Sequence, residues 1–314
     1  MPCNWEIAAS AWAGHVLGVP HFAETFCHRI AVRALCGLPL LSLLLGGVLR
    51  SGAHAELILQ IDLVTAEIAK DPSNADLYLK RGQLRREHVE FDLAFADFAK
   101  AESLSPGHTQ LELARGRLFL DWGWLLSARA SLDRFIARVP GHEDALILRA
   151  RVLQRLECRR AAVDDYDTVL RHSKEPGPDL FIERSQLLMT MGEAHWTEAL
   201  RGLDDGIARL GQLVTLQLFA IDSEMKLQRF DKALERVDQI TERSPRKETW
   251  LARRGEILVQ AGRRAEARTA YESALAALNR LPPARRNVPA MIELASRIQK
   301  QIESLPAPAP APAP

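Results

Sequence analysis

Residues 72–106 read PSNADLYLKRGQLRREHVEFDLAFADFAKAESLSP, a stretch that begins and ends with proline. Its landmarks return along the chain at a constant interval: a proline, then a small residue, an alanine and a large apolar residue. The four columns are Pro72, Pro106 and Pro140; Gly82, Gly116 and Ala150; Ala94, Ala128 and Ala162; and Phe98, Leu132 and Tyr166. A fixed period of this length is typical of proteins built from stacked structural repeats.

This period, with small residues at two fixed points, resembles the tetratricopeptide repeat (TPR) family. The resemblance implies that each repeat contains two helices, here called helix A and helix B, joined by a short turn. A small residue where the two helices cross allows their backbones to approach closely. The large apolar residue of helix B then fills the gap between neighbouring repeats. Proline ends helix B because it cannot continue an intrahelical hydrogen-bond ladder. The sequence contains no alternating strand pattern bounded by turn pairs, so an all-α fold is expected.

The first and last repeats match the TPR pattern closely. The first repeat carries Tyr78, Gly82, Ala94, Phe98, Ala101 and Pro106, and the last carries Leu251, Gly255, Gly262, Ala267, Tyr271 and Ala274. The resemblance implies a right-handed α-solenoid of about six TPR-like helix-turn-helix repeats at residues 73–281, with N- and C-terminal capping helices. The fifth repeat departs from the pattern, because Ile221 stands where a small residue is expected. A looser helix crossing is therefore predicted there.

The segments that flank the repeats have their own predicted roles. Residues 56–72 form an N-terminal capping helix or half-repeat, with an apolar face of Leu57, Ile58, Ile61, Val64 and Ile68. Residues 282–305 form a C-terminal capping helix, whose apolar face holds Met291, Leu294, Ile298 and Ile302. Terminal repeats of a solenoid need such caps to cover the exposed core. The alternating Pro-Ala run at 306–314 predicts a disordered, extended tail.

The segment at 1–55 has the pattern of a signal peptide. Arg29 and Arg33 precede an uncharged run at 34–49, and Ala53-His54-Ala55 follows it. Such a basic, apolar and small-residue order predicts export, a periplasmic location and cleavage after Ala55. The alternative is an uncleaved N-terminal segment that anchors the protein in the inner membrane, facing the periplasm. The family resemblance is then to exported bacterial-type TPR proteins.

Composition and charge exclude several classes of function. The chain has 41 Lys and Arg against 40 Asp and Glu, so it has no overall field that would favour nucleic acid. Without the leader, Cys158 is the one remaining cysteine, and no internal disulfide is expected. The sequence has no paired metal-ligand motif, haem motif, phosphate-binding glycine loop or nucleophile elbow. No catalytic residue, metal or cofactor is therefore predicted. An enzyme would need an unrecognised site, for instance around His195 and Trp196.

The concave face of the repeats is the candidate binding site. The resemblance implies that fixed positions of helix A line this groove, which here mixes arginine with aliphatic and methionine side chains. Lys and Asn, which hold chaperone tails in one TPR subtype, are replaced at the corresponding positions by Leu79 and Gln83 and by Leu113 and Arg117. The predicted groove residues are Arg86, Arg117, Leu120, Arg151, Arg155, Gln186, Met189, Met225 and Lys226. Arginine suits carboxylates and methionine adapts to varied apolar shapes, so an extended protein segment with acidic and apolar positions would fit.

An arginine precedes the small residue of helix A in five repeats: Arg81, Arg115, Arg149, Arg184 and Arg254. One interpretation is a ladder for an anionic ligand. The preferred interpretation is structural, because Asp97 and Asp165 follow Arg81 and Arg149 at one and the same spacing, on the facing helix B. We therefore expect these guanidinium groups to contact helix B carboxylates. Likewise, the tryptophans at the turns, Trp122, Trp124 and Trp196, either anchor a partner or, as preferred here, pack between repeats.

Together these features predict a non-catalytic scaffold or adaptor of the cell envelope that binds a protein or extended peptide in its concave groove. No nucleic-acid partner is expected, and membrane contact is expected only through an uncleaved N-terminus. The alternative function is a membrane-anchored structural subunit of an envelope complex that uses its convex face.

Overall fold

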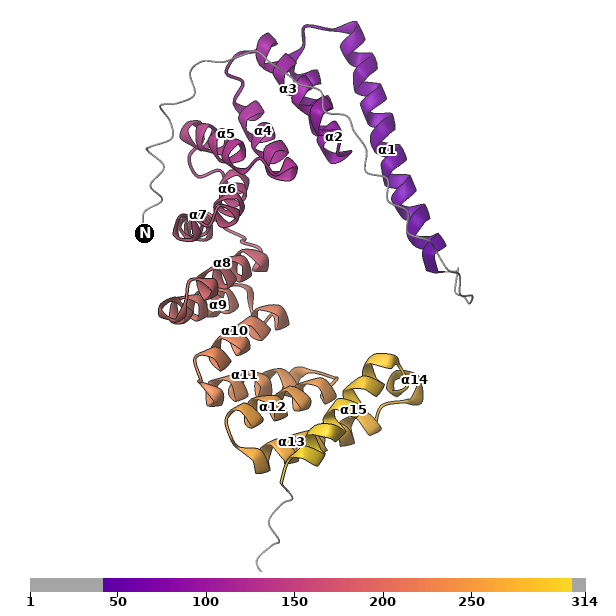
Figure 1. Cartoon of the computed structure of the whole chain (residues 1–314), viewed down its shortest axis with the longest axis vertical. Coiled ribbons are helices and arrows are strands. Elements are labelled where there is room, and N and C mark those ends of the chain that lie inside the picture. The colour runs from indigo at the N-terminus through magenta and orange to yellow at the C-terminus, as the bar shows by residue number, and fades with distance from the viewer. Residues whose placement is uncertain (1–41, 307–314) are drawn as a thin grey trace, which may run out of the picture. The chain divides into compact units, whose positions relative to one another are not determined.

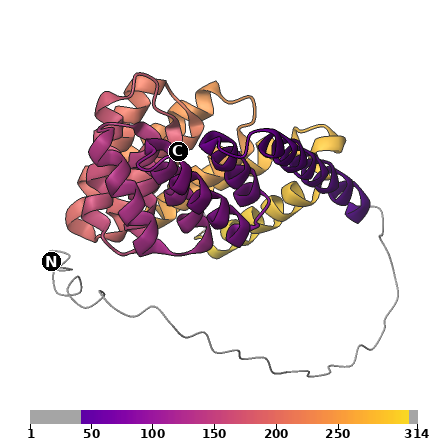
Figure 2. The same cartoon turned by 90° about the horizontal axis from the view of Figure 1, so that it is seen from above.

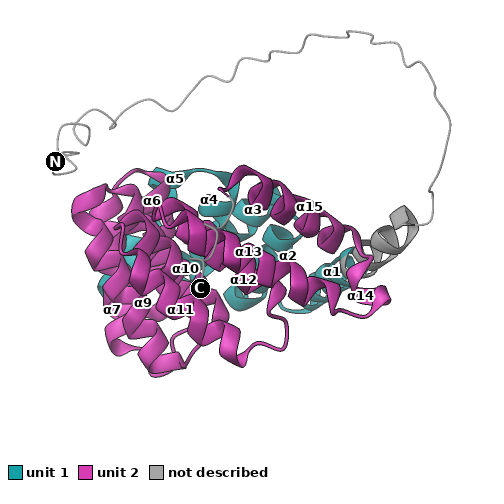
Figure 3. Ribbon diagram, turned by 90° about the horizontal axis from the view of Figure 1, so that it is seen from below, with its two compact units in different colours: residues 1–138 teal, residues 139–314 magenta. Residues whose placement is uncertain are grey.

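The computed structural model describes residues 42–306, and side chains are described from His54 onward (Figure 1). This part of the chain is built of helices and contains no strand, as Figure 2 also shows. The described part of the chain divides into two compact units, the first ending at Arg138 and the second beginning at Val139 (Figure 3). Residues 1–41 of the predicted leader and residues 307–314 of the Pro-Ala tail lie outside the described residues. None of the helices between residues 42 and 306 combines the length and apolar character needed to cross a membrane.

The first unit contains α1 and two helix pairs. Helix α1 (Ser42–Lys70) packs on α2 (Ala75–Glu87), which pairs with α3 (Phe91–Leu104). The second pair is α4 (Thr109–Trp122) and α5 (Leu125–Arg138). Asn74 caps α2 by accepting a hydrogen bond at 3.1 Å from the backbone N–H of Asp76. Ile61, Val64 and Ile68 of α1 are buried, as the predicted capping role requires.

Helix α1 differs from the expected capping helix in its length. It begins at Ser42, upstream of the predicted start at Glu56, and it continues without a break across Ala55. Ile58, predicted on the apolar face, is 42% exposed. The buried face of α1 is therefore narrower than the sequence indicated. Cleavage after Ala55 stays a prediction.

The second unit contains four helix pairs and a C-terminal cap. The pairs are α6 (Glu143–Arg155) with α7 (Arg159–His172), α8 (Pro178–Thr190) with α9 (Trp196–Leu210), α10 (Val214–Lys226) with α11 (Phe230–Arg243), and α12 (Glu248–Gln260) with α13 (Arg264–Asn279). The 3-10 helix η1 (Glu193–His195) leads into α9. The short α14 (Pro283–Arg286) precedes α15 (Pro289–Ser304), which packs on α13 through Met291, Leu294, Ile298 and Ile302. The all-α fold of about six helix pairs with a capping helix at each end is confirmed.

Close helix crossings occur where the sequence places glycine. A Cβ added at Gly82 would come within 2.7 Å of the Phe98 ring, and one at Gly255 within 2.6 Å of the Tyr271 ring. Real side chains do not pack at such distances, so these crossings require glycine. The fifth repeat behaves as predicted: Ile221 is fully buried, and α10 and α11 are the least closely packed of the six pairs.

Candidate functional site

The first helices of neighbouring repeats are joined by ion pairs along one face of each unit. In the first unit, Nη1 of Arg86 on α2 lies 2.5 Å from Oδ2 of Asp121 on α4. In the second unit, Nη2 of Arg151 on α6 lies 2.7 Å from Oε1 of Glu183 on α8, and Arg253 on α12 pairs with Asp222 on α10. Two arginines predicted to bind a ligand, Arg86 and Arg151, are therefore already neutralised by carboxylates of the next repeat.

Glu183 accepts hydrogen bonds from two different residues, Arg151 and Tyr166. Both of its oxygens accept hydrogen bonds from Arg151, and Oε2 also accepts one at 2.6 Å from the Tyr166 hydroxyl. Burial raises the pKa of Glu183, but the hydrogen bonds from Arg151 and Tyr166 outweigh it, and the pKa is lowered overall. Burial and the adjacent carboxylate raise the pKa of Tyr166 far above its ordinary value. Arg151, Tyr166 and Glu183 come from α6, α7 and α8, so their hydrogen bonds hold these three helices together.

Three further groove residues also have interaction partners within the structure. Arg117 and Leu120 lie half-buried on α4, and Arg155 lies exposed at the end of α6. Each takes part in a polar, ring or electrostatic contact. The structure thus gives the arginines of the predicted groove a larger structural role than sequence reasoning assigned to them.

The remaining groove residues meet on α8 and α10, which contact each other directly. Met189 and Met225 are half-buried, whereas Gln186 and Lys226 are exposed. Trp196 joins two of them: its Nε1–H donates to the Met189 carbonyl at 3.3 Å, and the Lys226 ammonium lies 5.7 Å from its ring centroid. Leu218 of α10 adds an aliphatic side chain that is 38% exposed. We call Gln186, Met189, Leu218, Met225 and Lys226 the α8–α10 face.

The five arginines of the helix A column all contact helix B carboxylates, as predicted, but with different partners. Arg81 and Arg149 pair with Asp97 and Asp165 of their own repeat, each through two guanidinium nitrogens. The other three reach back to helix B of the preceding repeat: Arg115 to Glu102, Arg184 to Asp167, and Arg254 to Asp238. Arg184 also contacts Glu198 of its own repeat at 3.3 Å.

The sequence distinguishes these two groups of arginines at one position of helix B. Three residues after the column alanine, helix B holds aspartate in the repeats of Arg81 and Arg149, but it holds Ser131, Gly202 and Ala270 in the repeats of Arg115, Arg184 and Arg254. Without a carboxylate at this position of its own helix B, each of these guanidinium groups turns to the preceding one. The arginine column therefore also joins neighbouring repeats.

The tryptophans at the turns mostly pack against neighbouring aromatic rings, in line with the structural interpretation preferred from the sequence. The rings of Trp122 and Trp124 stack with centroids 4.1 Å apart, around Gly123, whose left-handed φ of 86° ends α4. Trp122 also meets Phe91 and Phe95 of α3, so it fills the gap between two repeats. Trp124 stacks on Phe119 but remains 47% exposed. Among the described residues, no group of three or more His, Cys, Asp or Glu could hold a metal ion.

Comparison with known proteins agrees with the repeat pattern. Residues 198–290 match the tetratricopeptide repeat-like domain family. A TPR protein from Parabacteroides merdae is similar to 82% of this chain over 98% of its own length, at 16% identity and a TM-score of 0.48. The C-terminal part of a TPR repeat-containing protein from Cytophaga hutchinsonii is similar to 82% of this chain over 92% of its length, at 15% identity and a TM-score of 0.49. No curated protein sequence matches the chain.

Proposed function

Since residues 198–290 contain a tetratricopeptide repeat-like domain, as the repeat columns predicted, we propose that this protein is a non-catalytic scaffold that binds a protein partner through the α8–α10 face. Repeat solenoids present extended surfaces of this kind for recognition. The observation that carries the proposal is the convergence of Met189, Trp196 and Lys226, together with the exposed Leu218 on the same helix as Lys226.

The contacts narrow the chemistry of the partner. Arg86 and Arg151 are paired with Asp121 and Glu183, so they do not provide unpaired charges for a ligand. Lys226 has no carboxylate partner among the described residues and lies at the edge of an apolar surface. The methionines adapt to different side-chain shapes. A partner segment with apolar residues and one acidic residue next to Lys226 fits this face.

The cell envelope is the proposed location, on the basis of the leader pattern in residues 1–55. In this proposal the mature protein begins at Glu56 and works in the periplasm. The alternative, a structural subunit held in the inner membrane by an uncleaved N-terminus and packing through its convex face, predicts a chain that retains residues 1–55. Mass spectrometry of the N-terminus of the protein purified from its native cells distinguishes the two.

Affinity capture with matched variants tests the binding face. Leu218→Asp combined with Lys226→Glu alters two exposed side chains and removes one described contact between helices, that of Lys226 with the Trp196 ring. The control is Ile292→Asp on α15, an aliphatic residue that is 57% exposed. We expect the double variant to lower recovery of the partner by about tenfold or more, as loss of a central contact does in other interfaces. Equal recovery with the double variant and the control would contradict the proposal, provided that circular dichroism shows both to be folded.

A further inference from the structure

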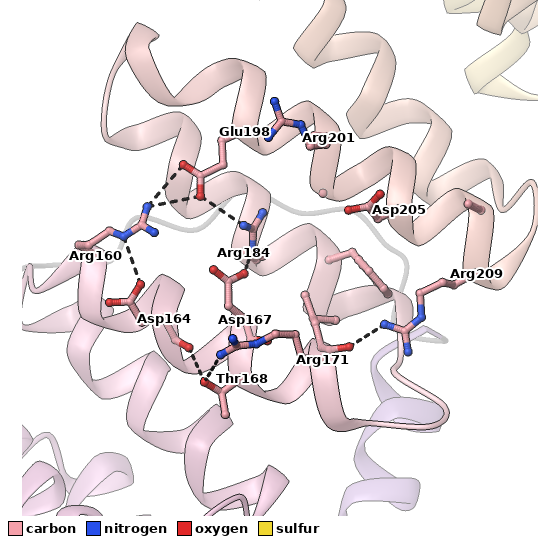
Figure 4. A pocket seen from close by; sticks show the side chains of 14 residues that line it. Arg160, Asp164, Asp167, Thr168, Arg171, Arg184, Glu198, Arg201, Asp205 and Arg209 are labelled. Carbon is pink, nitrogen blue, oxygen red and sulfur yellow. Dashed lines mark hydrogen bonds and ion pairs between the residues drawn. The ribbon is translucent and has the colours of Figure 1, made fainter.

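A large open cavity lies among the charged side chains of α7, α8 and α9 (Figure 4). Its volume is about 930 Å³, at the upper end of the range of small-molecule sites. Helices α7 and α9 are the second helices of their repeats, so this cavity is separate from the α8–α10 face. Five arginines and four carboxylates line it, which leaves an excess of positive charge.

Arg184 forms the buried centre of this cavity. Its residue is 9% exposed, and its guanidinium group contacts Asp167 on α7 and Glu198 on α9. Its Nη1 atom is buried and has no hydrogen-bond partner. Gly202 makes room for this atom, since a Cβ at that position would lie 2.6 Å from it. The base of the cavity therefore holds a guanidinium group whose hydrogen-bonding capacity is only partly used.

Two other arginines line the cavity without a carboxylate partner of their own. Arg209 donates to the carbonyl oxygens of Leu170 and Ser173, at 2.7 and 2.9 Å. Arg171 donates to the carbonyl of Asp167 and to the hydroxyl of Thr168. Neutral acceptors hold these side chains in place without cancelling their charge. Their positive charges therefore remain available to an anionic group in the cavity.

Arg201 and Asp205 complete the lining of the cavity from α9. Both are exposed, and neither has a hydrogen bond or ion pair among the described residues. Arg201 adds a third guanidinium group that is not paired with a carboxylate. Asp205 contributes the one lining carboxylate that has no such contact in the described part of the chain. Arg201 should thus attract an anionic ligand, and Asp205 should oppose it.

We propose that the α7–α9 cavity binds an acidic segment of a polypeptide, with Arg201, Arg171 and Arg209 contacting its carboxylates. Guanidinium groups match carboxylates through paired hydrogen bonds, and several of them here face one space. The volume accommodates several residues and far exceeds the volume of a single inorganic anion. The proposal concerns a second binding surface and does not depend on the one proposed for α8 and α10.

Fluorescence anisotropy with a labelled octaglutamate peptide tests this proposal, and the corresponding octaglutamine peptide controls for charge. The full chain should bind octaglutamate and not octaglutamine. Arg201→Glu should weaken binding by about tenfold, the effect of about 1.4 kcal/mol. The matched control, Arg264→Glu, changes an exposed arginine on α13 that lies outside the cavity, and it should alter binding by less than about twofold. Asp205→Asn removes the opposing charge, so it should strengthen octaglutamate binding.

Several results would overturn the proposal. These are failure of octaglutamate to bind at about 1 mM, an equal loss with Arg264→Glu, or weaker binding with Asp205→Asn. Displacement of the peptide by an equal concentration of inorganic phosphate would instead indicate a small-anion site. Arg201→Gln provides a second variant in case the charge reversal disturbs α9. The variant of Leu218 and Lys226 should bind octaglutamate as the wild type does, so failure of one binding surface is distinguishable from failure of the other.

Discussion

Arg81 and Arg184 occupy the same column of the repeat, but their surroundings differ. The Arg81 side chain is 13% exposed and pairs with Asp97 of its own repeat, whose side chain is 4% exposed and also accepts from Arg85. Arg184 is as deeply buried, but its carboxylates come from two different repeats and one of its nitrogens has no partner. One arginine closes its own helix pair, and the other joins neighbouring pairs beside an open cavity.

The comparison shows that the repeat fixes an arginine at this position of helix A but does not fix which carboxylate the arginine contacts. The column places a guanidinium group next to the helix crossing in each case. The partner depends on which carboxylates the two adjacent helices B provide, and this changes from repeat to repeat. Where helix B of the same repeat has an aspartate opposite the arginine, as Asp97 is opposite Arg81, the two form an ion pair within the repeat. Where Gly202 stands at that position, opposite Arg184, hydrogen-bonding capacity remains unused at the α7–α9 cavity.

The largest expected effect comes from Asp97→Ala. This change leaves Arg81 and Arg85 without their shared carboxylate inside a well-packed pair. Removing one partner of a buried ion pair typically lowers the free energy of unfolding by about 3–5 kcal/mol. Urea unfolding followed by circular dichroism measures the loss. A loss below about 1 kcal/mol would show that the Arg81 contact is no more important to stability than a surface pair.

Two glycine-to-alanine substitutions test how tightly the helices pack in the repeats of Arg81 and Arg184. Gly82→Ala places a methyl group against the fully buried Phe98 ring, and we expect a net loss of about 1–2 kcal/mol after the gain in helix propensity. In Gly202→Ala the one contact that is too close is with the end of the Arg184 side chain, which is flexible, and Ser185 Oγ lies at an ordinary distance. Its unfolding free energy should stay within about 0.5 kcal/mol of wild type. A larger loss for Gly202→Ala than for Gly82→Ala, in the same urea titrations, would contradict this explanation.

Two glutamates of the second unit should respond to pH in opposite directions. The lowered pKa of Glu183 means that it stabilises the fold above its unfolded pKa of about 4.3, and this contribution disappears as the pH falls through the folded pKa. Burial raises the pKa of Glu224 despite the nearby Arg236, and its Oε2 has no hydrogen-bond partner. Its contribution to stability therefore improves as the pH falls from neutral through the folded pKa.

Replacing each glutamate by glutamine tests this prediction directly. Glu183→Gln should lower the unfolding free energy by about 1 kcal/mol at pH 7, because its partners are partly exposed, and by less near pH 4. Glu224→Gln should be neutral or stabilising at pH 7, with the difference from wild type vanishing on acidification. Urea titrations at several pH values provide the comparison. The same sign for both variants at pH 7 would exclude the assigned environments.

Among the carboxylates that pair with the arginine column, Asp238 should give the smallest effect when it is replaced by alanine. Its pair with Arg254 belongs to the same column, but the two side chains are 49% and 30% exposed. Water competes for such contacts, so the unfolding free energy should fall by no more than about 1 kcal/mol. Adding about 0.5 M salt should reduce this difference further. A loss as large as that of Asp97→Ala would remove the distinction between buried and exposed members of the column.

The sequence was sufficient to predict the fold, because the conditions for close helix crossings repeat along it. Gly82 with Phe98 and Gly255 with Tyr271 are local requirements that the regular period of the sequence reveals. The looser crossing at Ile221 was predicted for the same reason. The extension of α1 upstream of Glu56 was not, because the leader pattern indicated a boundary at that position.

The candidate site was less predictable from the sequence. Family positions identified Met189, Met225 and Lys226, but they could not show that Trp196 joins two of them. Nor could they show that Asp121 and Glu183 neutralise Arg86 and Arg151, since these pairs join residues of different repeats. The α7–α9 cavity was missed because residues from three helices line it, with no common spacing in the sequence.

Site-specific photo-crosslinking tests the central claim, that a partner protein binds the α8–α10 face, most directly. The photoreactive residue p-benzoylphenylalanine would replace Leu218 in the full chain in living cells, and Ile292 in a parallel control. Both positions are exposed, so each substitution should leave the fold intact. We predict a discrete crosslinked partner at position 218 and none at position 292. Crosslinking at position 292 alone, or at neither position, would contradict the claim.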